Sequence, residues 1–238
     1  MILRRIRRKL YKITHPAIAE VWMLHRVVDS RSDLPGERTL EVTPTWLRQQ
    51  VDQHLAAGGR FVSLDTLMHE LQQPAKRQKG TVAVTFDEGC RETLEQVLPL
   101  FRQRQIPFAL FVATDFVGGA HPIGWYRQQP PMMSWDELAA VCRDPLCTIG
   151  AHTVSHPHLC QLSEAQVMEE LTLSRQQLEE RLHIPIRYFS HPYGERNAAV
   201  MDCARQAGYT AAFEAWGGAV RTRANHYNLP RIPKTQTP

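Results

Sequence analysis

The feature that most limits the fold of this chain is a regular alternation of short apolar runs with segments of helical periodicity. Continuous apolar runs such as TVAVTF (81–86) and FALFVAT (108–114) are typical of strands buried on both faces of a parallel sheet. Strands that alternate with helices at this spacing indicate βαβ units. The predicted strands are 20–28, 60–64, 81–86, 108–114, 147–153, 186–194 (running into a turn), 209–215 and 226–232 (a strand or an extended segment).

The helical segments complete these units. Ser134 with Glu137 and Ser163 with Gln166 have the spacing of a capping box, and Pro99 should bend or shorten the helix in which it lies. The Gly/Pro-rich stretch 115–133 is expected to be a long loop, and such loops often carry function. The predicted helices are 43–59 (capped by Thr43 or Thr45), 65–73 (capped by Asp65), 92–105, 134–144, 163–183 and 197–208.

This many units in 238 residues predicts a single-domain α/β fold. A small (β/α) barrel suits the short spacing better than an open doubly wound sheet, which is the alternative. No GxGxxG or GxxxxGK[ST] motif follows a strand, so the sequence lacks the motifs that would best indicate a nucleotide-binding fold.

The positive charge of the chain is concentrated at its N-terminus. Net charge is +4, and MILRRIRRKLYK (1–12) contains six basic residues, so the remainder is close to neutral. Apolar residues at helical spacing between these charges predict an amphipathic helix. It either makes a peripheral contact with an anionic membrane at the inner leaflet or packs on the body as an ordinary terminal helix. No second basic patch with aromatic residues follows, so nucleic acid is not expected as a partner. We therefore separate a basic segment, 1–18, from a catalytic domain, 19–238.

The cysteine pattern and the hydropathy indicate the compartment. The five cysteines are scattered, odd in number and without CxxC spacing, which argues against a disulfide framework and fits a reducing environment. No window of the sequence has the length of apolar residues that a membrane span needs, and the N-terminus lacks the pattern of a signal peptide. A cytoplasmic location is the expectation.

Polar side chains gather at the predicted strand ends, where parallel α/β folds place their reactive groups. Two adjacent carboxylates, Asp87 and Glu88, end one buried strand and would repel each other unless a cation neutralised them. Two imidazoles four residues apart, His152 and His156, follow another strand, and Pro157 keeps the second of them out of a helix. Carboxylates and imidazoles together predict a metal site with nitrogen and oxygen ligands, typical of zinc. Further strand-end residues are His158, His191, Tyr193 and Arg231.

Each of these motifs has a simpler explanation when taken alone. A DE pair is commonly a solvated helix start, an HxxxH spacing is common by chance, and Arg231 could be a surface residue of a terminal strand. The metal-site interpretation rests on the coincidence of both motifs with the ends of buried strands.

With these motifs in order along the chain, the sequence resembles the polysaccharide deacetylases, the NodB-homology carbohydrate esterases. The resemblance is carried by TFDEG (85–89), HTVSH (152–156) and SHPYG (190–194), with MLHRV and LPRI near the two ends, and covers about residues 20–233. It implies a distorted (β/α)7-type barrel with a groove open to a glycan. It also implies a hydrolase that removes an N-acetyl, or less often an O-acetyl, group from an amino sugar.

The resemblance also assigns roles to residues. It implies that Glu88, His152 and His156 hold a divalent metal, most often zinc, with cobalt, nickel or iron(II) as alternatives. It makes Asp87 the general base and gives the backbone N–H of Tyr193 to the oxyanion. Arg231 is a candidate partner that holds Asp87 ionised. Candidate sugar-stacking residues are Trp125, Tyr126, Trp135 and Trp216, with Pro192 and Tyr193 of the PYG motif also expected to contact substrate.

The chain departs from the family pattern at three points. The acidic ligand is Glu88 where Asp is usual, so its carboxylate reaches about one methylene further while metal–oxygen distances tolerate only about 0.2 Å. The usual Arg of the third motif is replaced near Phe189 and Ser190, for which Arg231 could substitute. No LxH motif is present near the C-terminus, which leaves His226 and His191 as candidates for the general acid.

These observations lead to two interpretations from different classes. The first is a metal-dependent deacetylase acting on an acetylated amino sugar or glycan precursor, in bacterial surface-polysaccharide synthesis. The alternative is a non-catalytic glycan-binding protein on the same fold, which the three departures support. A hydrolase of phosphoesters is disfavoured, because one metal site with few basic residues around it suits phosphate poorly.

Overall fold

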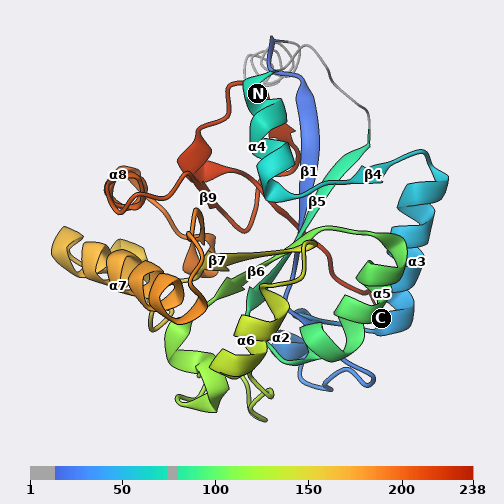
Figure 1. The fold of residues 1–238 in the computed structure, drawn as a ribbon, viewed down its shortest axis with the longest axis horizontal. Coiled ribbons are helices and arrows are strands. Elements are labelled where there is room, and N and C mark those ends of the chain that lie inside the picture. Colours follow the sequence, from blue (N-terminus) through green and yellow to red (C-terminus); the bar gives the residue numbers. More distant parts are fainter. Residues whose placement is uncertain (1–13, 74–79, 238) are drawn as a thin grey trace.

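The fold is built on one predominantly parallel sheet. The computed structural model describes residues 14–73 and 80–237, and residues 1–13, which include the amphipathic helix expected over 1–12, lie outside this part. Figure 1 shows the sheet running through the middle of the molecule with helices around it. The strands are β1 Ala17–Leu24, β2 Arg26–Val27, β3 Glu41–Val42, β4 Arg60–Phe61, β5 Thr81–Glu88, β6 Phe108–Val112, β7 Cys147–Ala151, β8 Tyr188–Ser190, β9 Ala211–Phe213, β10 Val220–Arg221 and β11 Ile232–Pro233.

The main sheet has the order β10-β1-β5-β6-β7-β8-β9, and β4 pairs with the beginning of β5. Pairing from β1 through β5, β6, β7 and β8 to β9 is parallel throughout, while β10 runs antiparallel to β1. All eight residues of β5, the second of these strands, are buried. The continuous apolar runs therefore mark strands covered on both faces, as the sequence predicted.

The C-terminal segment closes the sheet into a distorted barrel. Leu229 exchanges backbone hydrogen bonds with β9, donating to Ala212 and accepting from Glu214, both at 2.9 Å. A few residues later β11 pairs in parallel with β1, and the Lys234 N–H donates to Met23. This segment and the six parallel strands together form the ring expected of a (β/α)7-type barrel in a single domain.

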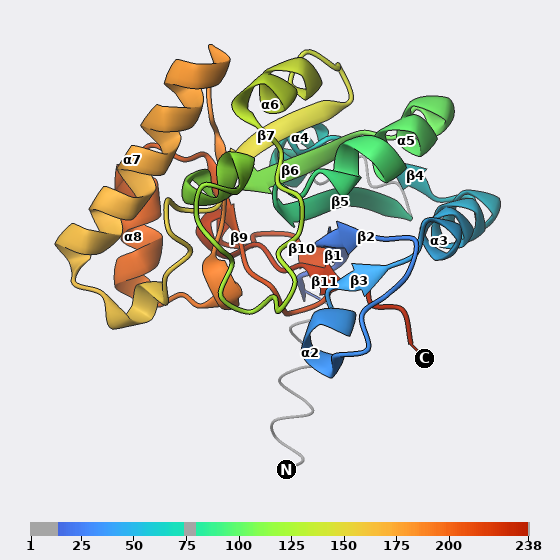
Figure 2. The ribbon, with the colours of Figure 1, turned by 90° about the horizontal axis from the view of Figure 1, so that it is seen from below.

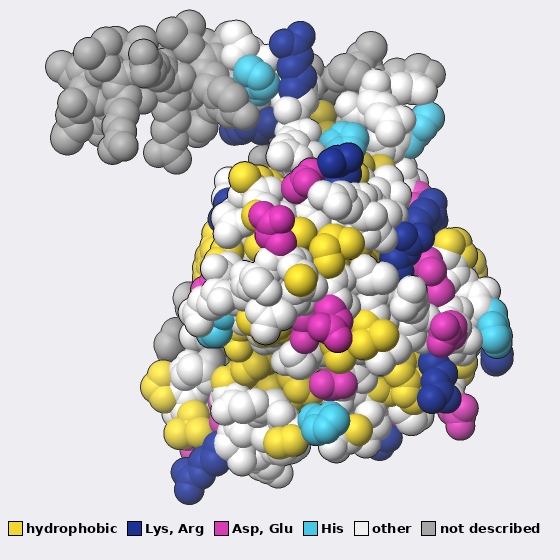
Figure 3. Space-filling model, turned by 90° about the vertical axis from the view of Figure 1, so that its left-hand side faces the viewer, with side chains coloured by type: hydrophobic (Ala, Val, Ile, Leu, Met, Phe, Trp, Pro, Cys, Tyr) yellow, Lys and Arg dark blue, Asp and Glu magenta, His cyan; other side chains and the backbone are white. Residues whose placement is uncertain are grey.

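Helices cover the outside of the barrel. Figure 2 shows α7 and α8 along one side of the sheet, α5 and α6 over the next part, and α3 at the far side. In Figure 3, the side at the left of Figure 1 carries acidic, basic and apolar side chains interspersed rather than gathered by sign. The α-helices are α2 Pro35–Arg38, α3 Pro44–Ala56, α4 Leu64–Gln72, α5 Leu98–Arg104, α6 Trp135–Val141, α7 Glu164–Leu182 and α8 Ala198–Gln206, and the shorter turns are η2 Thr93–Val97, η3 Thr114–Gly119, η4 Leu159–Gln161, η5 Pro192–Gly194 and η6 His226–Asn228.

Two apolar clusters lie on the two faces of the sheet. The larger includes Val84 and Phe86 of β5 together with residues of α3, α5, α6, α7 and α8. The smaller fills the inside of the barrel with Ala83, Phe111 and Phe213, and is covered by Leu67 and Met68 of α4. Because adjacent residues of a strand face opposite ways, the register that points Ala83 inward also points Asp87 inward.

The helix predicted over 92–105 is present, but it changes type at Pro99. A π-helical turn, η2, precedes α5, and Pro99 lies in the first turn of α5. A proline is tolerated there because its missing N–H has no partner in the first turn of an α-helix.

Several predicted boundaries were wrong. The strand predicted over 20–28 is interrupted at His25, and its last part, β2, pairs with β3 instead of the main sheet. The strand predicted over 60–64 has only two residues, because Ser63 caps α4 by accepting the Thr66 N–H. Asp65 is therefore not the cap of this helix. The segment 226–232, predicted as a strand or an extended segment, is extended after Asn228 and enters β11, but it begins with the turn η6.

None of the helices in the described part of the chain has the length and apolar character needed to cross a bilayer.

Candidate active site

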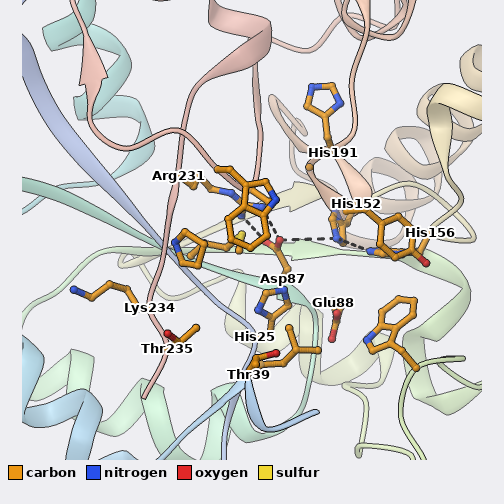
Figure 4. Close-up of a pocket in the computed structure, with 18 of the residues that line it drawn as sticks. His25, Thr39, Asp87, Glu88, His152, His156, His191, Arg231, Lys234 and Thr235 are labelled. Atoms are coloured by element: carbon orange, nitrogen blue, oxygen red, sulfur yellow. Dashed lines mark hydrogen bonds and ion pairs between the residues drawn. The ribbon is translucent and has the colours of Figure 1, made fainter. Parts of the chain in front are cut away.

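Asp87 and Arg231 form a buried ion pair at the carboxyl ends of the strands (Figure 4). Arg231 donates from both terminal nitrogens to the two carboxylate oxygens of Asp87, each at 2.7 Å, and the two side chains are 1% and 3% exposed. Ser190 at the end of β8 also accepts from Arg231 at 2.8 Å, and the Arg231 Nε donates to the Glu214 carbonyl. Arg231 is thus not a surface residue, and it makes the contact with Asp87 that the sequence suggested.

The charge of Arg231 decides the protonation of Asp87. Burial alone would raise the pKa of this carboxyl group, but the guanidinium beside it outweighs that effect and holds the pKa well below its usual range. Asp87 is therefore ionised at neutral pH and oriented by a two-point contact.

His152 and His156 converge on the same place from the loop after β7. Their Nε2 atoms are 3.1 Å apart, and the Nε2 of His152 is 3.9 Å from an Asp87 oxygen. The Nδ1 of His152 lies 2.8 Å from the Ser190 carbonyl, which can only accept, so Nδ1 carries the proton and Nε2 presents a lone pair. Burial lowers the pKa of both rings, that of His156 to about 2, which keeps them neutral. As Pro157 indicated, neither histidine lies in a helix.

The histidine pair fits a divalent metal. Two ligands of a tetrahedral zinc ion lie about 3.3 Å apart at the usual Zn–N distance, close to the separation of the two Nε2 atoms. The Nδ1–carbonyl contact of His152 is the kind of outer contact that fixes the tautomer of a metal ligand. Within residues 14–73 and 80–237, however, no group of three or more His, Cys, Asp or Glu side chains is arranged to hold a metal ion.

Glu88, the third ligand that the resemblance implies, is bonded elsewhere. It is buried and lies beside the histidines in the cavity wall, but its Oε2 accepts from the Tyr126 hydroxyl at 3.4 Å. Burial and the neighbouring Asp87 raise the pKa of this carboxyl group to about 8. Because both acids are buried, the pair is not a solvated helix start, the simpler explanation considered for it. The role of Glu88 as a metal ligand stays a prediction.

The ion pair and the histidines line a cavity of about 750 Å³. Three aromatic side chains contribute to its wall: Trp125, Tyr193 and Trp216, of which Trp216 is 63% exposed. The Trp125 ring centroid is 4.5 Å from that of His156, and the Tyr193 centroid is 4.6 Å from it. The rings of Trp125 and Tyr193 therefore contact His156 directly, and all three aromatic side chains offer apolar surface to a ligand in the cavity.

The other expected aromatic and PYG-motif residues do not line this cavity. Tyr126, which belongs to the loop 115–133, is buried in a small apolar cluster, and Trp135 packs on the core beside α7 with Arg181 over its ring. Pro192 is buried at the start of η5, so the structure does not place its side chain at the cavity wall. We correct the expectation of a four-residue aromatic wall to Trp125 and Trp216, joined by Tyr193.

The two candidates for the general acid occupy different places. His226 begins η6 and is not among the residues of the cavity wall. His191 is in the wall, but its Nε2 donates to the Tyr227 carbonyl at 3.1 Å and burial lowers the pKa of the ring to about 4. His191 is therefore neutral at neutral pH and carries its proton on the nitrogen that is bound to a backbone carbonyl.

Sequence reasoning missed His25. This residue directly follows β1, whose Leu24 pairs with Phe86, so His25 lies beside Asp87 in the cavity wall. Burial lowers its pKa to about 4. The signal was available, because His25 is a polar residue that interrupts an apolar run at a strand end. Ser190, which bonds both Asp87 and Arg231, was noticed only as a departure from the family motif.

Comparison with known proteins identifies the family of this chain. A sequence model of the family described as Polysaccharide deacetylase matches residues 75–212, more than half of the chain. The poly-beta-1,6-N-acetyl-D-glucosamine N-deacetylase of Staphylococcus aureus is 22% identical over 203 residues, which cover 82% of this chain and 68% of that protein.

Solved structures share the fold over almost the whole chain. The deacetylase PplD of Streptococcus pyogenes superposes with a TM-score of 0.79 at 19% identity, covering 91% of this chain and 92% of PplD. IcaB from Ammonifex degensii superposes with a TM-score of 0.78 at 25% identity, covering 92% of both chains. The chain belongs to the polysaccharide deacetylase family.

Proposed function

We propose that the protein is a metal-dependent hydrolase that removes the N-acetyl group from an amino sugar of a glycan. The observation that carries the proposal is the position of the ionised Asp87 carboxylate, 3.9 Å from one of two converging neutral histidines, in a cavity bordered by aromatic rings. A carboxylate beside metal-binding imidazoles is the arrangement that metal-assisted hydrolysis needs.

The relatives support the choice of substrate class. The Staphylococcus aureus relative is named as a deacetylase of poly-beta-1,6-N-acetyl-D-glucosamine, and it aligns with most of this chain. Trp125 and Trp216 give the cavity the apolar faces on which sugar rings stack. We therefore take an oligosaccharide of N-acetylglucosamine as the first substrate to test.

His152 and His156 would hold the metal through their Nε2 atoms, and Glu88 is the remaining candidate ligand. When bound, a divalent ion, with zinc as the first candidate, would polarise the acetyl carbonyl and lower the pKa of a water molecule. The residues of the chain supply the other parts of the reaction.

Asp87 takes the proton of the attacking water as general base. Arg231 keeps this carboxylate ionised and oriented, and the backbone N–H of Tyr193 is assigned to the oxyanion. Asp87 lines the cavity in which the substrate would bind, so the proton that it takes from the water can be passed on to the leaving amine. Asp87 therefore replaces His226, which lies away from the cavity, as our candidate for the acid.

One observation favours a second candidate function. The Glu88 carboxylate is bonded to Tyr126, and a three-ligand group is not assembled in the described part of the chain. A protein with this geometry that binds no metal would recognise a glycan without cleaving it.

The deciding experiment combines metal analysis with acetate release. Protein purified without chelator should contain about one equivalent of transition metal, and this metal should be lost in His152→Ala, His156→Ala. The loaded protein should release acetate from N-acetylglucosamine oligosaccharides, and Asp87→Asn should not. If Asp87→Asn still binds sugar and no metal-loaded form releases acetate, the enzyme interpretation is rejected in favour of a glycan-binding protein.

A further inference from the structure

The Glu88 carboxyl group has a hydrogen-bond partner, Tyr126, in the loop 115–133. Glu88 is the last residue of β5 and has a φ of 75°, in the left-handed region that side chains other than glycine rarely adopt. Its oxygen accepts a hydrogen bond from Tyr126, while the preceding residue, Asp87, faces Arg231 inside the barrel. Figure 4 shows the Glu88 side chain separate from the Asp87–His152–His156 group.

Tyr126 is itself firmly placed. Its ring is 4% exposed and belongs to a small apolar cluster with Phe116, Ile123 and Met132. The Tyr126 N–H donates to the Ile123 carbonyl at 3.1 Å, and its own carbonyl accepts from Gln129 at 2.9 Å. A rotation of the phenol would require this cluster to repack, so the hydroxyl is a fixed donor and the longer Glu88 side chain is the part that can move.

The guanidinium of Arg26 lies over the ring of Tyr126. It lies 5.3 Å from the centroid of the Tyr126 ring, and Glu41 and Glu92 bind its nitrogens. Arg26 is therefore neutralised by two carboxylates of its own. The direct hydrogen bond to Glu88 therefore comes from Tyr126 and not from Arg26.

We propose that Tyr126 is a positioning residue that holds the Glu88 carboxylate away from the histidine pair, so that its hydroxyl competes with a divalent cation for this ligand. The inference rests on the function proposed above. A metal ligand must place its oxygen about 2.0–2.2 Å from a zinc ion. Glu88 can do so beside His152 and His156 only by leaving the Tyr126 hydroxyl, which would then be buried without a partner.

The test is the affinity for Zn²⁺ and Co²⁺ alone, measured by calorimetry and by the visible absorption of bound Co²⁺. Tyr126→Phe removes the hydroxyl and keeps the ring. We expect it to bind either ion about threefold to tenfold more tightly than the wild-type chain, the range that corresponds to one net hydrogen bond. Tyr209→Phe is the matched control, since Tyr209 is a buried tyrosine whose hydroxyl donates to the Leu171 carbonyl at 2.8 Å. It should leave metal affinity unchanged.

A second pair of variants, based on Glu88→Asp, tests whether the effect of Tyr126→Phe depends on the Tyr126–Glu88 contact. In Glu88→Asp the carboxylate is retained but shortened, and a contact that is already 3.4 Å long is lost. Adding Tyr126→Phe to Glu88→Asp should therefore change metal affinity by less than about twofold. This comparison stands even where Tyr126→Phe alone lowers the stability of the loop.

The outcomes separate this inference from the proposed function. Equal or weaker binding by Tyr126→Phe, with tight binding by the wild type, overturns the competition and leaves the metal-dependent function standing. If neither protein binds Zn²⁺ or Co²⁺, the metal site and the competition fail together. Tighter binding in the single variant, absent in the Glu88→Asp background, establishes Tyr126 as the competitor.

Discussion

The two terminal nitrogens of Arg231 donate hydrogen bonds of 2.7 Å to the two carboxylate oxygens of Asp87, although the two residues are 144 positions apart in the sequence. The contact spans the barrel from the C-terminal segment to β5. It converts a buried carboxylate, which would otherwise be costly, into an ionised and oriented one. Ser190 supports the pair by accepting from Arg231.

The first prediction concerns this pair. Arg231→Met leaves a buried charge without a partner and should lower the free energy of unfolding by about 3–5 kcal/mol, with loss of acetate release. Urea denaturation measures the first effect. Adding Asp87→Asn to Arg231→Met removes the stranded charge and should recover part of the stability. A double variant as unstable as the sum of the single variants would show that the pair is not coupled.

The second prediction follows from the depressed pKa of Asp87. A carboxyl group whose folded pKa lies below its unfolded value stabilises the fold above the unfolded value, about 3.9, and loses this contribution as the pH falls toward the folded pKa. The difference in unfolding free energy between the wild type and Asp87→Asn should therefore be constant from pH 7 to about pH 5. At lower pH the wild type should lose stability relative to Asp87→Asn. A difference that stays constant down to pH 3 would contradict the assignment.

The third prediction concerns Trp216, which is 63% exposed at the cavity. Trp216→Ala should raise KM for an N-acetylglucosamine oligosaccharide about threefold to tenfold, as expected for the loss of one ring contact. Its effect on the melting temperature should be small, because the side chain is largely exposed. Leu173→Ala, at an exposed apolar position on α7, is the control. A large loss of stability with unchanged KM would assign Trp216 to packing instead.

The fourth prediction concerns the stack of His158 on Tyr193. The two rings are parallel with centroids 4.0 Å apart, and Glu195 binds the His158 Nδ1 at 3.1 Å. Tyr193 has a φ of 56°, so neighbouring contacts must hold it in place at the cavity.

His158→Ala should therefore reduce kcat/KM, while His158→Phe, which preserves a flat ring, should retain most of it. Steady-state kinetics on both variants decides the matter. Equal loss in both would mean that the imidazole acts by its chemistry and not by its stacking.

Prediction from the sequence was most accurate for features that depend on a few neighbouring residues. Alternating apolar runs and helical periodicity predicted the βαβ units, and the capping boxes at Ser134 and Ser163 are both formed. Asp87, His152 and His156 were placed correctly at strand ends, because parallel strands gather these ends at one edge. Errors occurred at short elements such as β4, where the Ser63 cap outweighed a weak strand preference.

By itself, then, the sequence determined the order of the elements and the kinds of chemical groups at their ends, since hydrophobic periodicity and caps act over a few residues. The tertiary structure alone decided how those groups pair. Closure of the sheet by the segment after Leu229 brings Arg231 to Asp87, and the packing of the loop 115–133 brings Tyr126 to Glu88. Both contacts join segments far apart in the chain, and their geometry depends on barrel closure and side-chain packing, which no local pattern encodes.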